Sequence, residues 1–142
     1  KSLFNAVCAT ILGQQPALDI FGDDCATPDG SCVRDYIHVN DLAATHELAL
    51  GWLETGGASR AFNCGYGRGV SVLDVVRAAE QVTGKSIPVS LLPRRWFDPE
   101  TVVADPNRLK TQLNWQPEFD NLSEMIASTL EWERRKLALS RS

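Results

Sequence analysis

The sequence lacks three features that would each assign it to a well-defined class of protein. Acidic residues outnumber basic ones by 18 to 14, and the net charge of −4 argues against nucleic-acid binding, which normally needs a basic surface. No apolar run approaches the roughly 18 residues of a membrane span, and there is no signal-peptide pattern, so we expect no membrane association and a cytoplasmic location. The 142 residues, 44% of them hydrophobic, suffice for one domain with its own core.

Metal-binding patterns are also missing. Cys8, Cys25, Cys32 and Cys64 form no C-x-x-C pair and have no nearby histidine set, so we expect no zinc site. Four cysteines could form two disulfides, but nothing else in the sequence indicates secretion. We therefore expect reduced thiols. His38 has no partner residues in the sequence that would give it a chemical role.

The most informative stretch is 27–41. Its first four residues, Thr-Pro-Asp-Gly, predict a tight turn. The β-branched and aromatic residues of 33–39 predict a half-buried strand, and Asn40 and Asp41 predict the capped start of a helix that runs to Glu54.

Alternation along this strand would place Arg34, Tyr36 and His38 on one face. The opposite face would hold Val33, Asp35, Ile37 and Val39. An arginine beside a tyrosine suits an anionic ligand with a ring, because guanidinium pairs with phosphate and a phenol offers a stacking face. An exposed strand face whose arginine pairs with a neighbouring acid is the alternative.

A second candidate site follows the predicted strand 87–92. Its proline-bounded loop, 93–99, holds Arg95 and Asp98. Arg34 and Arg95 could together clamp a diphosphate, since each charge-assisted hydrogen bond contributes roughly 1.5–3 kcal/mol, and Asp98 could accept hydrogen bonds from ribose hydroxyls. A solvated charged loop is the alternative.

The remaining pattern predicts a mixed α/β fold with short strands and about five helices. The other expected elements are an extended run over 18–21 and helices over 3–12, 72–83, from Asp105-Pro106 to 113, and over 122–139. Ser71 should cap the helix 72–83, and Gly84 should end it. In the last helix we expect five buried residues: Leu122, Met125, Ile126, Leu130 and Trp132. The glycine run 65–69 has the spacing G-x-G-x-G and lacks the acidic residue that a dinucleotide-binding fingerprint requires.

Several of these segments resemble one family. Phe21-Gly22, the turn 27–30, Val-Arg-Asp-Tyr-Ile-His-Val over 33–39 and Asp-Leu-Ala over 41–43 are similar to the UDP-glucose 4-epimerases, which are extended short-chain dehydrogenase/reductases. The resemblance runs from about Ser2 to about Trp132. It covers the C-terminal half of the family's enzymes, which holds the UDP-sugar. It does not cover their N-terminal Rossmann half, which binds NAD.

The resemblance implies that residues 1–142 form a C-terminal UDP-sugar-binding domain without the Rossmann half. It also implies seven substrate-binding residues: Leu3, Asp19, Phe21, Arg34, Tyr36, Arg95 and Asp98. In the family, the segment aligned with 19–21 lies along the uracil, and the glycine run 65–69 is a tight connection. Two positions depart from the family pattern: Ser2 replaces an asparagine, and Phe97 replaces a glycine.

The family's reaction interconverts UDP-glucose and UDP-galactose in galactose metabolism, and it needs NAD and a tyrosine four residues before a lysine. Tyr36 is followed at that distance by Asn40, and Tyr66 by Val70, so no catalytic residue can be assigned. We therefore expect a fragment that binds no NAD and is inactive alone. Its exposed apolar face would be covered in a homo-oligomer or by the missing Rossmann half. The alternatives are a free-standing, non-enzymatic module that binds a UDP-sugar or self-associates, and a structural remnant that binds nothing.

Overall fold

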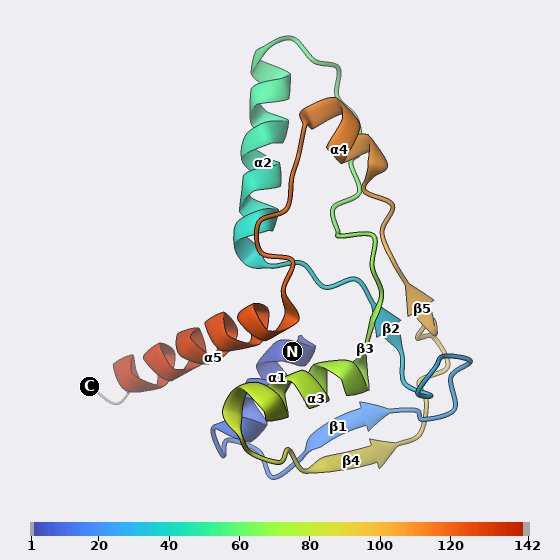
Figure 1. Cartoon of the computed structure of the whole chain (residues 1–142), viewed down its shortest axis with the longest axis vertical. Helices are drawn as coiled ribbons and strands as arrows, with labels where there is room; N and C mark the ends of the chain where they lie inside the picture. The colour runs from blue at the N-terminus through green and yellow to red at the C-terminus, as the bar shows by residue number, and fades with distance from the viewer. Residues whose placement is uncertain (1, 141–142) are drawn as a thin grey trace. The chain divides into compact units, whose positions relative to one another are not determined.

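The computed structural model describes residues 2–140, which divide into two compact units (Figure 1). Among the described residues, the first unit consists of the segments 2–33, 70–101 and 121–140, and the second consists of 34–69 and 102–120. The predicted mixed α/β fold with five helices and short strands is confirmed for the described residues.

The first unit is built on three helices and a pair of parallel strands. These elements are α1 (Leu3–Ile11), α3 (Val72–Thr83), α5 (Leu122–Leu139), β1 (Leu18–Phe21) and β4 (Val89–Leu92). The three helices contact one another, and α1 also contacts β1. β1 pairs with β4 in a register that runs from Leu18 opposite Val89 to Phe21 opposite Leu92. The core contains apolar residues of all three helices and of β1, among them Val7, Leu18, Ile20, Val75, Ala79 and Ile126.

The second unit contains α2 (Val39–Glu54) and α4 (Asn107–Leu113), which contact each other. Its buried residues include Leu109, Leu113 and Trp115. The remaining strands are very short: β2 (Val33–Arg34), β3 (Val70–Ser71) and β5 (Thr101–Val102). They pair in the order β3-β2-β5.

Helix ends follow the sequence closely where a cap is present. Ser71 and Asp74 form a capping box at the start of α3, and Gly84 ends this helix with a φ of 67°. Asn121 caps α5, whose bounds are those predicted. These ends are encoded locally, because a capping side chain satisfies backbone N–H groups that the first turn leaves without partners.

The predicted strand 33–39 is wrong beyond Arg34, and α2 begins at Val39 rather than at Asp41. The cap is His38, whose ring Nδ1 accepts a hydrogen bond from the Asn40 backbone N–H at 3.1 Å. Because the ladder stops at Arg34, the expected alternation of faces does not hold, and His38 is buried.

Three smaller predictions also need correction. The strand expected from residue 87 begins at Val89, because Pro88 has no N–H to donate. α4 begins at Asn107 with Pro106 as its preceding cap residue, not at Asp105-Pro106. In α5, Met125, Ile126 and Leu130 are buried as predicted, but Leu122 is half-buried and Trp132 is 61% exposed. Among the described residues, no helix has the length and apolarity needed to cross a membrane.

Candidate functional site

Three of the predicted ligands meet in the first unit, where β1 and β4 end. Phe21 is the last residue of β1, and Arg95 follows β4 by three residues. The guanidinium carbon of Arg95 lies 3.5 Å from the centroid of the Phe21 ring, a cation–π distance. Arg95 Nη1 lies 4.0 Å from Asp98 Oδ2. The Arg95 side chain is 44% exposed, so its guanidinium remains accessible to a ligand while the ring fixes its position.

The backbone at Gly22 explains how this loop comes so close to β1. Gly22 has a φ of +87°, and a Cβ at this position would lie 3.1 Å from Arg94 Cβ. The two neighbouring arginines have different partners. Arg94 pairs with Glu100 at 2.7 Å, within the loop and its continuation, whereas Arg95 lies over Phe21. Arg94 therefore stabilises the loop, and Arg95 is the better candidate ligand.

Phe97, which stands where the similar family has a glycine, lies in an ordinary turn. The Asp98 N–H donates to the Arg95 carbonyl at 3.2 Å, with Trp96 and Phe97 between them. Asn114 is the non-glycine residue with positive φ in the described part of the chain, so Phe97 adopts no left-handed conformation. Phenylalanine is therefore accommodated without backbone strain. Its side chain is 63% exposed and meets Trp96 edge-on at 5.5 Å.

The other predicted ligands are distributed over both units. Leu3 is the half-buried first residue of α1, and Asp19 is exposed in β1; both belong to the first unit. Arg34, at the end of β2, and Tyr36 are half-buried residues of the second unit. The diphosphate clamp of Arg34 and Arg95 thus joins residues of different units and stays a prediction.

Asp35 organises the glycine run in the second unit. Its carboxylate accepts hydrogen bonds from the backbone N–H groups of Tyr66, Gly67 and Ala104, at 3.0, 2.9 and 3.2 Å. A Cβ on Gly65 would lie 2.5 Å from Asp35 Oδ2, so only glycine permits this approach. Within the run, the backbone N–H groups of Tyr66 and Gly67 are therefore already bonded to a carboxylate. Sequence reasoning missed this role of Asp35, because the two segments lie about thirty residues apart.

Tyr66 belongs to a second buried carboxylate cluster. Its hydroxyl donates to Asp41 Oδ2 at 2.6 Å and accepts from the His38 backbone N–H at 3.1 Å. Asp41, only 2% exposed, also accepts from the backbone N–H groups of Glu118 and Phe119. Burial, and then the hydrogen bond to Asp41, raise the pKa of Tyr66 above its ordinary value. The Tyr66 hydroxyl therefore ties the glycine run to the start of α2.

The turn 27–30 is confirmed, and it positions a third carboxylate, in the first unit. Asp29 accepts from the hydroxyls of Ser31 and Ser71 at 2.7 and 2.6 Å and from Arg77 at 3.0 Å. Partial burial opposes ionisation, but the hydrogen bonds from Ser71, Ser31 and Arg77 outweigh it and lower the pKa of Asp29 to about 2. These bonds tie the loop before β2 to the start of α3.

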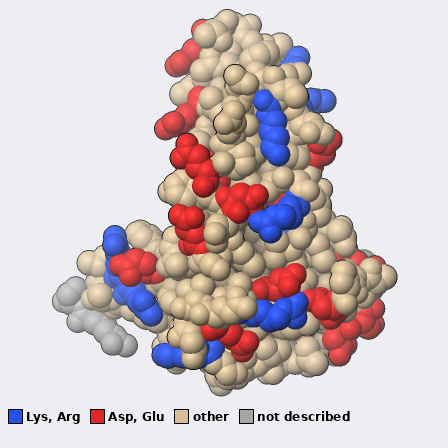
Figure 2. Space-filling view, in the orientation of Figure 1, with Lys and Arg blue, Asp and Glu red and all other residues tan. Residues whose placement is uncertain are grey.

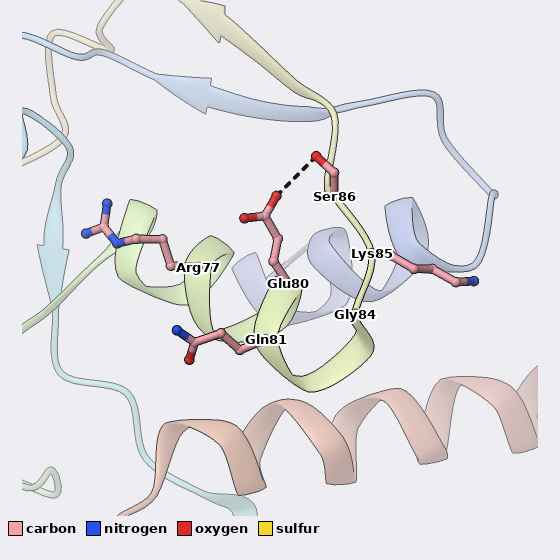
Figure 3. A pocket seen from close by; sticks show the side chains of 6 residues that line it. All are labelled: Arg77, Glu80, Gln81, Gly84, Lys85 and Ser86. Carbon is pink, nitrogen blue, oxygen red and sulfur yellow. Dashed lines mark hydrogen bonds between the residues drawn. The ribbon is translucent and has the colours of Figure 1, made fainter.

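An open depression of about 500 Å³ lies at the C-terminal end of α3, and none of the predicted ligands lines it (Figure 3). Its lining consists of Arg77, Glu80, Gln81, Gly84, Lys85 and Ser86. Glu80 accepts from the Ile87 N–H at 2.9 Å, and Arg77 pairs with Asp29 and Asp74. These side chains serve the local fold, so the depression has no assigned ligand.

Figure 2 shows acidic and basic side chains interspersed over the face that it draws. Within residues 2–140, no group of three or more His, Cys, Asp or Glu residues could hold a metal ion.

Comparison with known proteins identifies the relatives of this chain. Residues 1–65 match the NAD dependent epimerase/dehydratase family. A UDP-glucose 4-epimerase of Azospirillum brasilense is 50% identical over 132 residues, which are 93% of this chain and 38% of that protein. Two crystal structures of UDP-glucose 4-epimerases are also similar. The first, from Stenotrophomonas maltophila with bound NAD and formylated UDP-arabinopyranose, has a TM-score of 0.91 and 38% identity, over 99% of this chain and 41% of its own. The second, from Bifidobacterium longum with NAD+ and UDP, has a TM-score of 0.85 and 35% identity, over 94% of this chain and 39% of its own.

The match to the NAD dependent epimerase/dehydratase family covers residues 1–65, just under half of the 142 residues. The resemblance of the chain to UDP-glucose 4-epimerases is confirmed along nearly its whole length. The chain spans about two fifths of the length of the relatives that it matches.

Proposed function

We propose that this chain is the UDP-sugar-binding, C-terminal portion of an NAD-dependent UDP-glucose 4-epimerase. The observation that supports the proposal best is the position of Arg95 over the Phe21 ring, beside Asp98, at the ends of two parallel strands. A guanidinium held by an aromatic ring is preorganised for a phosphate, because it loses little freedom when the ligand arrives. The proposed ligands in the first unit are Arg95, Phe21 and Asp98, with Leu3 and Asp19.

Arg34 and Tyr36 are the proposed ligands from the second unit. Arg34 would share the diphosphate with Arg95, and Tyr36 would provide a polar aromatic surface for the nucleotide sugar. One diphosphate would account for Arg34 and Arg95, the two arginines that the sequence singles out. This arrangement also explains why Arg94, paired with Glu100, is not needed as a ligand.

Catalysis, in this proposal, belongs to a complete epimerase that supplies the hydride carrier and the base. Tyr66 donates to a buried carboxylate and has a raised pKa, which does not suit a base. The glycine run beside Asp35 does not fit NAD. We therefore propose that the chain alone holds the sugar nucleotide and does not turn it over.

Thermal unfolding in the presence of UDP-glucose tests the binding part of this proposal. At one hundred times Kd, the ligand stabilises the folded state by about 2.7 kcal/mol, which corresponds to a rise in Tm of roughly 5–10 °C. Uridine without phosphates serves as the control and should shift Tm less. No rise in Tm at millimolar UDP-glucose would contradict the proposal and favour a remnant that binds nothing.

An assay of the same protein for UDP-galactose formation, with NAD supplied, distinguishes a chain that only binds the sugar nucleotide from one that is active alone. We expect binding without turnover, and turnover by this chain alone would overturn the claim that the catalytic residues lie elsewhere.

Both units expose apolar side chains: Leu91, Trp96 and Phe97 in the first unit, and Leu50 and Leu53 in the second. Such exposed apolar side chains support association with a second copy or with a Rossmann half. A monomer at high concentration in sedimentation would count against self-association.

A further inference from the structure

Two cysteines of the first unit face each other across the loop that precedes β2. The Sγ atoms of Cys25 and Cys32 lie 3.6 Å apart, and both thiols are free. The residues are only 6% and 7% exposed. They are seven positions apart in the chain, so the contact is made by the folding of the loop and not by a helical turn.

The backbone of the loop holds the two cysteines together. The Cys25 N–H donates to the Gly30 carbonyl at 2.9 Å, and the Thr27 hydroxyl donates to the Ser31 carbonyl at 2.7 Å. Gly30 has a φ of +80°, and a Cβ there would lie 2.1 Å from the Asp23 carbonyl oxygen. On the other side, the Cys32 carbonyl accepts from the Val72 N–H at 3.0 Å. The thiol pair is therefore built into a fixed loop.

We propose that Cys25 and Cys32 form a redox-active dithiol, which oxidants convert to an intramolecular disulfide within the first unit. The sulfurs must move from 3.6 Å apart to a bond length of about 2.05 Å. Side-chain rotation with a small adjustment of the loop provides that movement. The crosslink would close the loop directly before Arg34.

The oxidant is a peroxide, and the reaction balances in two steps. One thiolate attacks a peroxide oxygen, the O–O bond breaks, and after proton transfer a sulfenic acid and one water form. The second thiolate then attacks the sulfenic sulfur, the S–S bond forms, the S–O bond breaks, and a second water leaves. Two thiols lose two electrons in total, and one peroxide gains them.

The other two cysteines are internal controls. Cys8 lies in the core on α1, where burial, and then Glu133, raise its pKa to about 11. Cys64 belongs to the second unit, where its thiol donates to the Thr45 hydroxyl at 3.4 Å. Burial, and then the hydrogen bond with Cys32, raise the pKa of Cys25 above its ordinary value, so its oxidation should accelerate at alkaline pH.

The test treats the folded wild-type protein with hydrogen peroxide, alkylates the remaining thiols in denaturant and measures the intact mass. A protease that cleaves before aspartate places Cys25 in the peptide 24–28 and Cys32 in 29–34. We expect these two peptides to be joined by a disulfide, while the peptides that contain Cys8 and Cys64 are alkylated. The rate should rise about tenfold per pH unit below the thiol pKa, because the thiolate is the nucleophile.

Variants and an unfolded control define the results that would overturn the proposal. Cys25→Ser or Cys32→Ser should abolish the linked peptide, whereas Cys64→Ser should leave its yield unchanged. The proposal fails if folded wild-type protein gives no linkage between 24–28 and 29–34, or if Cys8 or Cys64 takes part instead. It also fails if the same linkage forms as fast in urea, because the folded loop would then contribute nothing. Since the wild-type protein carries the main result, a variant that misfolds does not obscure it.

Discussion

Replacing Tyr66 by phenylalanine tests the buried carboxylate cluster of the second unit. The change removes the hydroxyl that donates to Asp41 at 2.6 Å and accepts from the His38 N–H at 3.1 Å. It keeps the aromatic ring, which stacks on Trp115 with centroids 6.2 Å apart. A hydrogen bond to a charged group contributes about 1.5–3 kcal/mol, and the His38 N–H loses its acceptor in a buried position. We therefore expect Tyr66→Phe to lower the free energy of unfolding by about 2–5 kcal/mol.

Urea unfolding followed by circular dichroism measures this loss. Asp120→Asn is the control, because Asp120 pairs with Arg68 in an exposed ion pair of the same unit and should contribute at most about 1 kcal/mol. The double variant Asp41→Asn/Tyr66→Phe should lose less than the sum of the two single changes, by at least about 1 kcal/mol, because the two residues share one interaction. A loss below about 1 kcal/mol for Tyr66→Phe, or strictly additive losses, would refute the role given to this cluster.

Three further changes test other parts of the structure. Asp29→Asn should destabilise the protein by roughly 2 kcal/mol at pH 7, because the folded pKa of Asp29 is about 2 against an ordinary 3.8. That stability is present above pH 4 and is lost as pH falls toward 2, so the acid unfolding curves of wild type and variant should converge. A constant difference between the two curves would contradict the lowered pKa. Gly65→Ala should lower the free energy of unfolding by about 1–3 kcal/mol, measured by thermal unfolding, because the new Cβ would meet Asp35. Gly84→Ala should lower it less, because the space there is open and only the positive φ opposes a side chain. Equal losses would mean that Asp35 moves freely. Phe97→Gly should change the free energy of unfolding by less than about 1 kcal/mol, because the Phe97 side chain is 63% exposed and its backbone is unstrained. A larger loss would show that Phe97 packs against the rest of the loop.

Local signals in the sequence predicted the parts of the fold that depend on neighbouring residues. Ser71 and Gly84 bound α3 because a cap and a left-handed glycine act within one turn. The strand 33–39 was mispredicted for the opposite reason. Its β-branched composition favours a strand, but Asp35 and His38 form side-chain hydrogen bonds that replace the ladder. Asp35 finds its partners thirty and seventy residues further along the chain, and no periodicity records such contacts.

In the candidate site, too, the sequence predicted the individual residues but not the contacts between distant ones. Arg95 and Asp98 could be singled out because an arginine suits a diphosphate and a carboxylate suits ribose hydroxyls. The structure places Arg95 over Phe21 and 4.0 Å from Asp98. The sequence did not predict that Arg94 would pair with Glu100 while Arg95 lies over the ring. Nor did it predict the contact of Cys25 with Cys32, which depends on the course of the whole loop.

The affinities of UDP and uridine for wild type, Arg95→Ala and Arg94→Ala, measured by calorimetry, test the proposed site most directly. The two arginines are adjacent and differ in partner, so Arg94→Ala is the matched control. We predict that Arg95→Ala weakens UDP binding about 10- to 100-fold and uridine binding less than threefold, as expected for the loss of charge-assisted hydrogen bonds to a diphosphate. Equal effects of the two substitutions on UDP, or UDP binding that survives Arg95→Ala unchanged, would contradict the assignment of this loop to a nucleotide sugar.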